Sequence, residues 1–135
     1  MGQQQLLLII LGVIVVGIAV AVGITMFSDN AVSANKDAVT NDLVNLASRA
    51  QQYYRRPQAL GGGGGTFAGL TADAAGLAKL TSKAKNSNGT YSIITAGDAT
   101  SVQLEGNGTE KGTDGNFLKV QMIVLADSTS VTFTN

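Results

Sequence analysis

The side chains that could do chemistry are few, and the densest group of oxygen donors falls late in the chain. Glu105, Glu110, Asp114 and Asn116 offer carboxylate and amide oxygens, the ligands that calcium prefers. Their spacing matches no EF-hand loop. Paired carboxylates for acid–base catalysis would also need a cleft, and no pattern marks one. We therefore expect solvated loop charges here, with no metal site.

The residue types that most enzymes depend on are missing altogether. The 135 residues include no cysteine and no histidine, so the usual nucleophile, the usual general base and the usual zinc ligands are absent together. Nine basic residues balance nine acidic ones, and only 13% of residues are charged, so no basic surface for nucleic acid is expected. The sequence predicts no enzyme, no catalytic residue, no cofactor and no nucleic-acid partner.

Two tripeptides fit the N-glycosylation pattern, Asn88-Gly89-Thr90 and Asn107-Gly108-Thr109. Each is also an Asn-Gly pair beside a predicted strand, which is sufficient reason for a turn at that place. We favour the turn at both places and keep Asn88 and Asn107 as candidate glycosylation sites.

Five consecutive glycines, Gly61 to Gly65, form the most unusual short segment. Such a run cannot hold a regular element by itself, so we interpret it as a loop or linker. A phosphate-binding loop would need a following Gly-Lys-Ser or Gly-Lys-Thr that opens a helix, and neither is present.

The elements that carry these side chains follow an uncharged apolar run, Leu6 to Phe27, near the start of the chain. As a helix its 22 residues span about 33 Å, which matches a bilayer hydrocarbon core of about 30 Å. A helix that is apolar on every side must be buried, either in lipid or among copies of itself. Because Met1 to Gln5 carry no Lys or Arg and the run is too long for a signal-peptide core, we expect a retained anchor.

Small residues recur within the apolar run at a spacing that favours close helix packing. Gly17 and Ala21, like Ala19 and Gly23, are four residues apart and share a helical face. The predicted assembly interface comprises Leu6, Leu7, Leu8, Ile10, Gly12, Ile14, Val16, Gly17, Ala19, Ala21, Gly23 and Phe27.

The helix is predicted to continue into water as an amphipathic half. Its apolar residues recur at intervals of three, four and seven, at Val32, Val39, Leu43, Leu46, Ala50 and Tyr53. No glycine or proline interrupts residues 28–55, and Pro57 disfavours helix in the residue before it. We expect one helix of about 75 Å, and three regions: residues 1–28, 29–57 and 58–135.

The rest of the chain predicts a small antiparallel sheet. Four segments are rich in β-branched and aromatic residues, 90–95, 101–104, 117–126 and 130–134. Turns are predicted at 97–98, 106–108, 114–116 and 126–128, with a short strand at 66–70 and a short helix at 72–84. The expected fold class is α+β, with the long helix packed on an antiparallel meander of about four strands.

This layout resembles the type IV pilins and the related pseudopilins. The likeness covers the whole chain as architecture, and the segment NLASRAQQYYRRPQALGGGGGTF looks like the helix end of a bacterial pilin. The chain departs from the bacterial pattern at Leu6, Leu7 and Leu8, which stand where a glutamate is expected. Gln3 to Gln5 are similar to the uncharged mature ends of archaeal-type pilins.

The resemblance implies a structural subunit of an extracellular filament on the cell surface, with an unassembled pool anchored in the cytoplasmic membrane. The implied partners are other copies of the chain in a helical homopolymer, membrane lipid before assembly, and a pilus assembly machinery. Two alternatives stay open: a minor pseudopilin of a secretion or DNA-uptake machine, and a single-span membrane protein with an outer binding domain.

Overall fold

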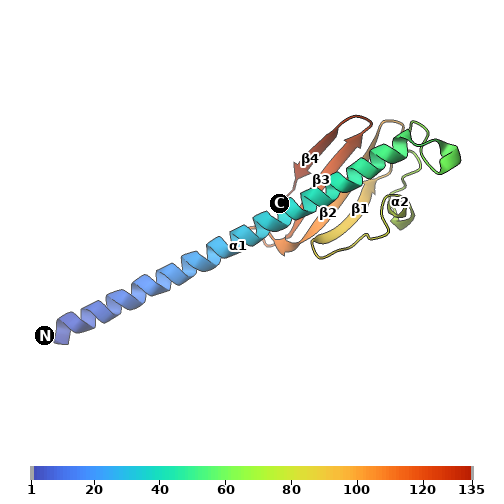
Figure 1. Cartoon of the computed structure of the whole chain (residues 1–135). Coiled ribbons are helices and arrows are strands. Elements are labelled where there is room, and N and C mark those ends of the chain that lie inside the picture. Colours follow the sequence, from blue (N-terminus) through green and yellow to red (C-terminus); the bar gives the residue numbers. More distant parts are fainter. Residues whose placement is uncertain (1, 135) are drawn as a thin grey trace.

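A computed structural model describes residues 2–134 and has one long helix with a small sheet packed on its C-terminal half (Figure 1). Helix α1 spans Gly2–Arg55, followed by the short 3-10 helix η1 at Gln58–Leu60 and helix α2 at Ala74–Ala78. The strands are β1 at Gly89–Thr95, β2 at Ser101–Lys111, β3 at Phe117–Leu125 and β4 at Thr129–Phe133. The predicted α+β class, with a long helix on an antiparallel sheet, is confirmed.

Helix α1 is unbroken over 54 residues and ends at Arg55, two residues before Pro57. Its second half buries the predicted apolar stripe, namely Val39, Leu43, Leu46, Ala50 and Tyr53, and Ala47 with them. Val32 is only partly buried, because it lies at the end of the sheet beside the turn between β2 and β3. The stripe therefore marks where the helix meets the rest of its own chain. We call residues 56–134 together with the helix segment they cover the head.

The sheet is an antiparallel meander in the order β1-β2-β3-β4, as predicted. Alternate residues of the two central strands face α1 and are almost fully buried, namely Val102 and Leu104 on β2, and Leu118, Val120, Met122 and Val124 on β3. The opposite face carries a hydrogen-bonded row of polar side chains, in which Gln121 Nε2 donates to Glu105 Oε2 at 2.9 Å. One face of the sheet thus holds the core and the other faces solvent.

The turn predicted at 106–108 is wrong, because these residues lie inside β2. Gly106 pairs with Tyr91 on one side and Val120 on the other. A Cβ atom at Gly106 would lie 2.6 Å from Val39 Cγ1, and one at Gly108 would lie 2.2 Å from Asn35 Oδ1. Glycine stands at both positions because α1 crosses β2 at very short range.

Two further local predictions are wrong, because tertiary contacts override local propensity. Residues 66–70 form a turn, not a strand, with Phe67 and Leu70 buried in the core. The helix predicted at 72–84 shortens to α2, which Asp73 caps by accepting from the Gly76 amide. The chain beyond it runs along β1, where Tyr91 N donates to Ala84 O at 2.7 Å.

The glycine run is a loop as predicted, but it is fixed against the end of α1 and does not act as a linker. Gly63 N donates to Tyr53 O, Gly64 N to Arg56 O and Gly65 N to Tyr54 O, at 2.7, 2.9 and 2.7 Å. The last carbonyls of a helix have no partner within the helix, so these amides supply what the helix cannot. The loop closes the C-terminus of α1.

Candidate membrane and assembly surface

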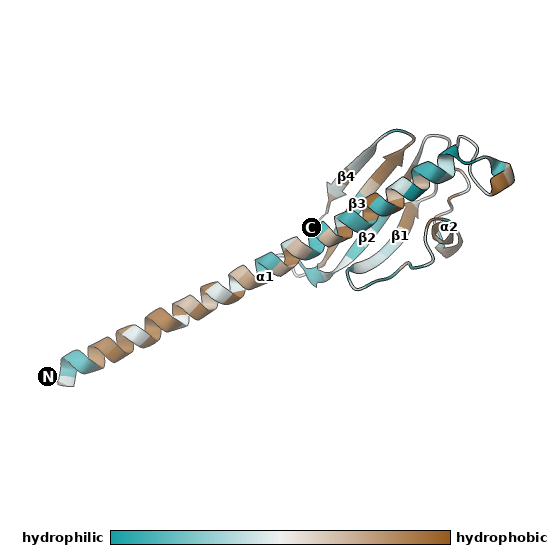
Figure 2. Cartoon of the chain, viewed as in Figure 1, coloured by the Kyte–Doolittle hydropathy of each residue, from teal (hydrophilic) through white to brown (hydrophobic). Residues whose placement is uncertain are grey.

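The first half of α1 has no partner among residues 2–134 and exposes its apolar side chains on all sides. Sixteen large apolar residues between Leu6 and Phe27 are each more than half exposed. Figure 2 shows this half as a nearly continuous apolar rod that projects away from the sheet. Burying a Leu, Ile or Val side chain stabilises by about 1.5–3 kcal/mol, so the whole rod gains tens of kcal/mol from an apolar surrounding.

This half is long and apolar enough to cross a membrane, and α1 is the one helix in the described residues that meets that criterion. Its only side-chain hydroxyl, on Thr25, donates to Ala21 O at 3.0 Å, so the hydroxyl is satisfied within the helix. A helix satisfies its own backbone polar groups as well. The projecting half is therefore compatible with membrane anchoring.

All the residues predicted for the assembly interface lie on this projecting half. The large ones among them, Leu6, Leu7, Leu8, Ile10, Ile14, Val16 and Phe27, are between 53 and 78% exposed. A Cβ atom built at Gly12, Gly17 or Gly23 would meet no atom within 4 Å. Nothing in a single copy explains glycine at these positions, in contrast to Gly106 and Gly108.

The head contains a polar cluster that pins the segment before β1 to the helix. Asp42 Oδ2 on α1 accepts hydrogen bonds from Asn86 Nδ2 at 2.8 Å, from Asn88 Nδ2 at 2.9 Å and from the Tyr91 hydroxyl. Burial raises the pKa of Asp42, but the three hydrogen bonds together outweigh it and hold that pKa below its ordinary value. Burial and the neighbouring carboxylate raise the pKa of Tyr91. No local sequence pattern indicates this cluster, because Asp42 lies more than forty positions from each of its three donors.

Asn35 makes a second tie between α1 and the sheet that sequence reasoning missed. Its Nδ2 donates to Asn88 O at 2.8 Å, and its Oδ1 accepts from the amides of Thr109 and Glu110 at 3.0 and 3.3 Å. Both groups hold Asn88: Asp42 accepts from its side-chain amide and Asn35 donates to its carbonyl. These contacts hold the fold together, and neither group has the open geometry of a catalytic site.

In both candidate glycosylation residues the side-chain nitrogen, to which a glycan would be attached, already donates a hydrogen bond. Asn88 Nδ2 donates to Asp42, and Asn107 Nδ2 donates to Glu105 Oε1 at 3.1 Å. Asn88 lies within a turn in which Asn86 Oδ1 accepts from the amides of Asn88 and Gly89, whereas Asn107 lies within β2. A glycan at either residue would have to replace these hydrogen bonds.

The four oxygen-bearing residues Glu105, Glu110, Asp114 and Asn116 do not form one cluster. Glu105 lies on the outer face of the sheet, whereas Asp114 and Asn116 hydrogen-bond to each other in the turn before β3. Among the described residues, no group of three or more acidic, histidine or cysteine residues could hold a metal ion.

A hollow of about 680 Å³ opens on the head at the end of the sheet nearer the projecting helix. Its lining includes Lys85, Asn107, Asn116, Phe117 and Lys119. Two cations, two amides and one aromatic ring would suit a polar ligand, but they do not form a catalytic group.

A scan against protein-family models finds no match, and neither curated proteins nor solved structures contain a match to this chain.

Proposed function

We propose that this chain is the structural subunit of an extracellular filament, assembled by packing the projecting halves of α1 from many copies. The observation that carries the proposal is the apolar half of α1, which is exposed on every side and continuous with a helix that its own head covers on one face only. A helix of this kind must be buried on all sides, and copies of itself satisfy that demand. The resemblance to type IV pilins in layout points to the same function.

The proposal gives the projecting half two successive environments. Before assembly it lies in the cytoplasmic membrane, with lipid around Leu6 to Phe27 and the head outside. An assembly machinery then extracts the subunit, and the helices of neighbouring copies replace the lipid. Close approach of helices at Gly12, Gly17 and Gly23 would give those glycines a function, because their positions are open in a single copy.

Electron microscopy of material sheared from cells tests the proposal. We expect long fibres composed mainly of this chain. Gly17→Leu, which places a large side chain on a helix-packing face, and Val16→Asp, which places a charge in the apolar core, should each abolish the fibres. The tyrosine near-ultraviolet circular dichroism of the head should stay unchanged in both variants, since Tyr53, Tyr54 and Tyr91 all lie in the head.

Leu60→Asp is the matched control. Leu60 is 71% exposed and lies on η1 in the head, so the variant adds the same charge to an exposed apolar site away from the projecting half. Fibres should persist in this variant. Intact fibres from Val16→Asp would overturn the proposal, as would short tips that contain this chain only as a minor component, the result expected of a pseudopilin.

The alternative of a single-span membrane protein with an outer binding domain is favoured by one feature, the hollow of about 680 Å³. In that case the chain would stay in the membrane fraction as a monomer or dimer. Val16→Asp would then prevent membrane insertion, but shearing would release no fibre from the wild type.

A further inference from the structure

The face of α1 that is turned away from the sheet is uncovered along the whole second half. Asp37, Asn41, Val44, Ser48 and Arg55 follow one another at intervals of four, three, four and seven, and all are exposed. Val44, an apolar residue, is 45% exposed on this face. We call these five residues the back face.

The charged residues in this stretch of helix divide into two groups. Lys36, Asp42 and Arg49 all engage their own head: Lys36 Nζ lies 4.0 Å from the Phe133 ring centroid, Asp42 binds its three donors, and Arg49 Nη1 donates to Leu80 O at 2.9 Å. Asp37 makes no hydrogen bond or ion pair among the described residues. Arg55 makes one long bond, from Nη2 to Ala126 O at 3.5 Å.

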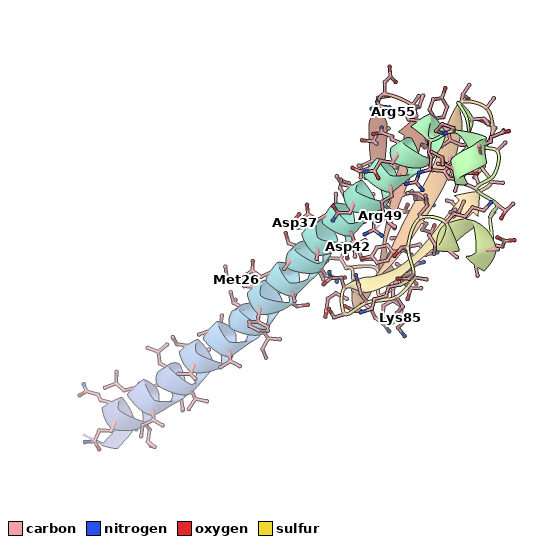
Figure 3. All side chains as sticks on the ribbon, turned by 45° about the vertical axis from the view of Figure 1, so that its right-hand side comes forward. Met26, Asp37, Asp42, Arg49, Arg55 and Lys85 are labelled. Atoms are coloured by element: carbon pink, nitrogen blue, oxygen red, sulfur yellow. The ribbon has the colours of Figure 1, made fainter. Side chains whose placement is uncertain are left out.

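The two charges on the back face therefore have bonding capacity to spare, and they are opposite in sign. In Figure 3 the labels of Asp37 and Arg55 lie on one side of α1, whereas those of Asp42 and Arg49 lie on the side toward β1. Eighteen residues separate Asp37 from Arg55, which is about 27 Å along the helix. They cannot meet within one copy.

We propose that Asp37 of one copy pairs with Arg55 of a second, parallel copy displaced by about 27 Å along the helix axis. This inference rests on the proposed filament. At this displacement the two apolar runs, each about 33 Å long, overlap by only about 6 Å, so the pair joins copies whose back faces meet, whereas copies at smaller displacements bury the apolar runs. Opposite charges on that surface make a second copy of this chain the occupant that fits it.

The Asp37–Arg55 pair would fix the axial register of neighbouring helices, which apolar contacts alone do not. Apolar contact is non-directional, and the run from Leu6 to Phe27 has no charged residue, so helices packed there can slide along one another at little cost. A polar pair at one defined height selects a single register, as a buried polar residue does in a coiled coil. We infer that the pair fixes the axial stagger of neighbouring subunits.

Charge exchange tests this inference. Asp37→Arg and Arg55→Asp should each reduce the yield of pelleted filament about fivefold to tenfold at low salt, or change the axial spacing of subunits in electron micrographs. The exchange variant with both substitutions should regain the wild-type yield and spacing. Because the two positions are about 27 Å apart in one copy, such recovery can arise only between copies.

Two matched controls carry the same changes of charge elsewhere on the head. Glu110→Arg changes an exposed residue near the end of β2, and Lys85→Asp changes a residue beside β1 on the other side of the helix. Both controls should assemble as the wild type does. Near-ultraviolet circular dichroism verifies that every variant keeps a folded head.

Mixing the variants gives an independent measurement. Copies carrying Asp37→Arg present two cations on the back face, and copies carrying Arg55→Asp present two carboxylates, so an equal mixture should form filament more readily than either variant alone. High salt should diminish the difference between the wild type and the single variants.

The outcomes separate this inference from the proposed function. Wild-type yield and spacing in both single variants would overturn the pair while the filament stands, and so would an exchange variant no better than the single variants. A wild-type chain that forms no filament at all would overturn the proposed function, and the pair with it.

Discussion

The two halves of α1 belong to one uninterrupted helix, yet within the part of the chain that the structure describes only the second half packs on a partner. The second half is apolar on one stripe and buries that stripe on the sheet, whereas the first half is apolar all round and buries nothing. Glycine follows the same division, since Gly106 and Gly108 touch the second half and Gly12, Gly17 and Gly23 face open space. The width of the apolar surface therefore indicates where the partner of each half lies.

The largest effect should come from removing a core side chain of the second half. Leu43 is fully buried, so Leu43→Ala should lower the free energy of unfolding of the head by about 2–5 kcal/mol. Leu11→Ala is the counterpart in the first half, where the side chain is 57% exposed, and should leave head stability unchanged. Urea unfolding of the full chain in detergent, followed by tyrosine fluorescence, measures both. Equal losses would contradict the division between the halves.

Enlarging the glycine at the helix–sheet contact should have the next largest effect. Gly106→Val would press on Val39 and Tyr91 and should cost about 1–3 kcal/mol. Gly23→Val, at a position with open space around it, should leave the unfolding midpoint of the head where it is. The same urea titration compares the two variants. A destabilised head in Gly23→Val would mean that the projecting half contacts the head.

Asp42 should make the stability of the head depend on pH. Its pKa is lowered in the folded state, so the stability it adds is fully present above the unfolded value of about 3.9 and is lost as the pH falls through the folded value. Asp42→Asn should cost about 1–2 kcal/mol at neutral pH and flatten the pH dependence below about pH 4. Thermal melts at a series of pH values measure this, with Asp37→Asn as control, since Asp37 has no partner in its own head. A pH dependence unchanged in Asp42→Asn would refute the assignment.

The smallest of these effects concerns the end of the helix. Gly61 has a φ of +80° with open space around its Cβ position, so Gly61→Ala is strained only through its backbone and should cost about 1 kcal/mol. Gly17→Ala is the helical counterpart, and it should raise local helix stability by about 1 kcal/mol without altering the head. Differential scanning calorimetry of both variants in detergent compares them. A Gly61→Ala head as stable as the wild type would show that the φ value at this position is not fixed.

The sequence predicts the helix, its end and the sheet order well, because each depends on a local or periodic pattern. The buried stripe from Val39 to Tyr53 and the stop before Pro57 are examples of such patterns. The described helix already includes Gly2 and the glutamines before the apolar run, because none of Gln3 to Gln5 breaks a helix.

The wrong or missing predictions concern residues whose conformation or partner is set by contacts distant in the sequence. An Asn-Gly pair is typical of a turn, and the turn before β1 has one, but Asn107-Gly108 lies in a strand because the helix crosses there. The Asp42 cluster joins residues more than forty positions apart, so no local pattern could indicate it. The partner of the projecting half stays a prediction, because no described residue of the head covers this half.

The five-glycine loop imposes an exact length on its own sequence. A flexible linker tolerates an added or deleted residue, but three amides of this run each reach a different carbonyl at the end of α1. One glycine more or fewer would shift every later amide by one position and leave helix carbonyls without donors. The number of residues in this loop is therefore as tightly fixed as the register of a core strand, although the loop consists of glycine alone.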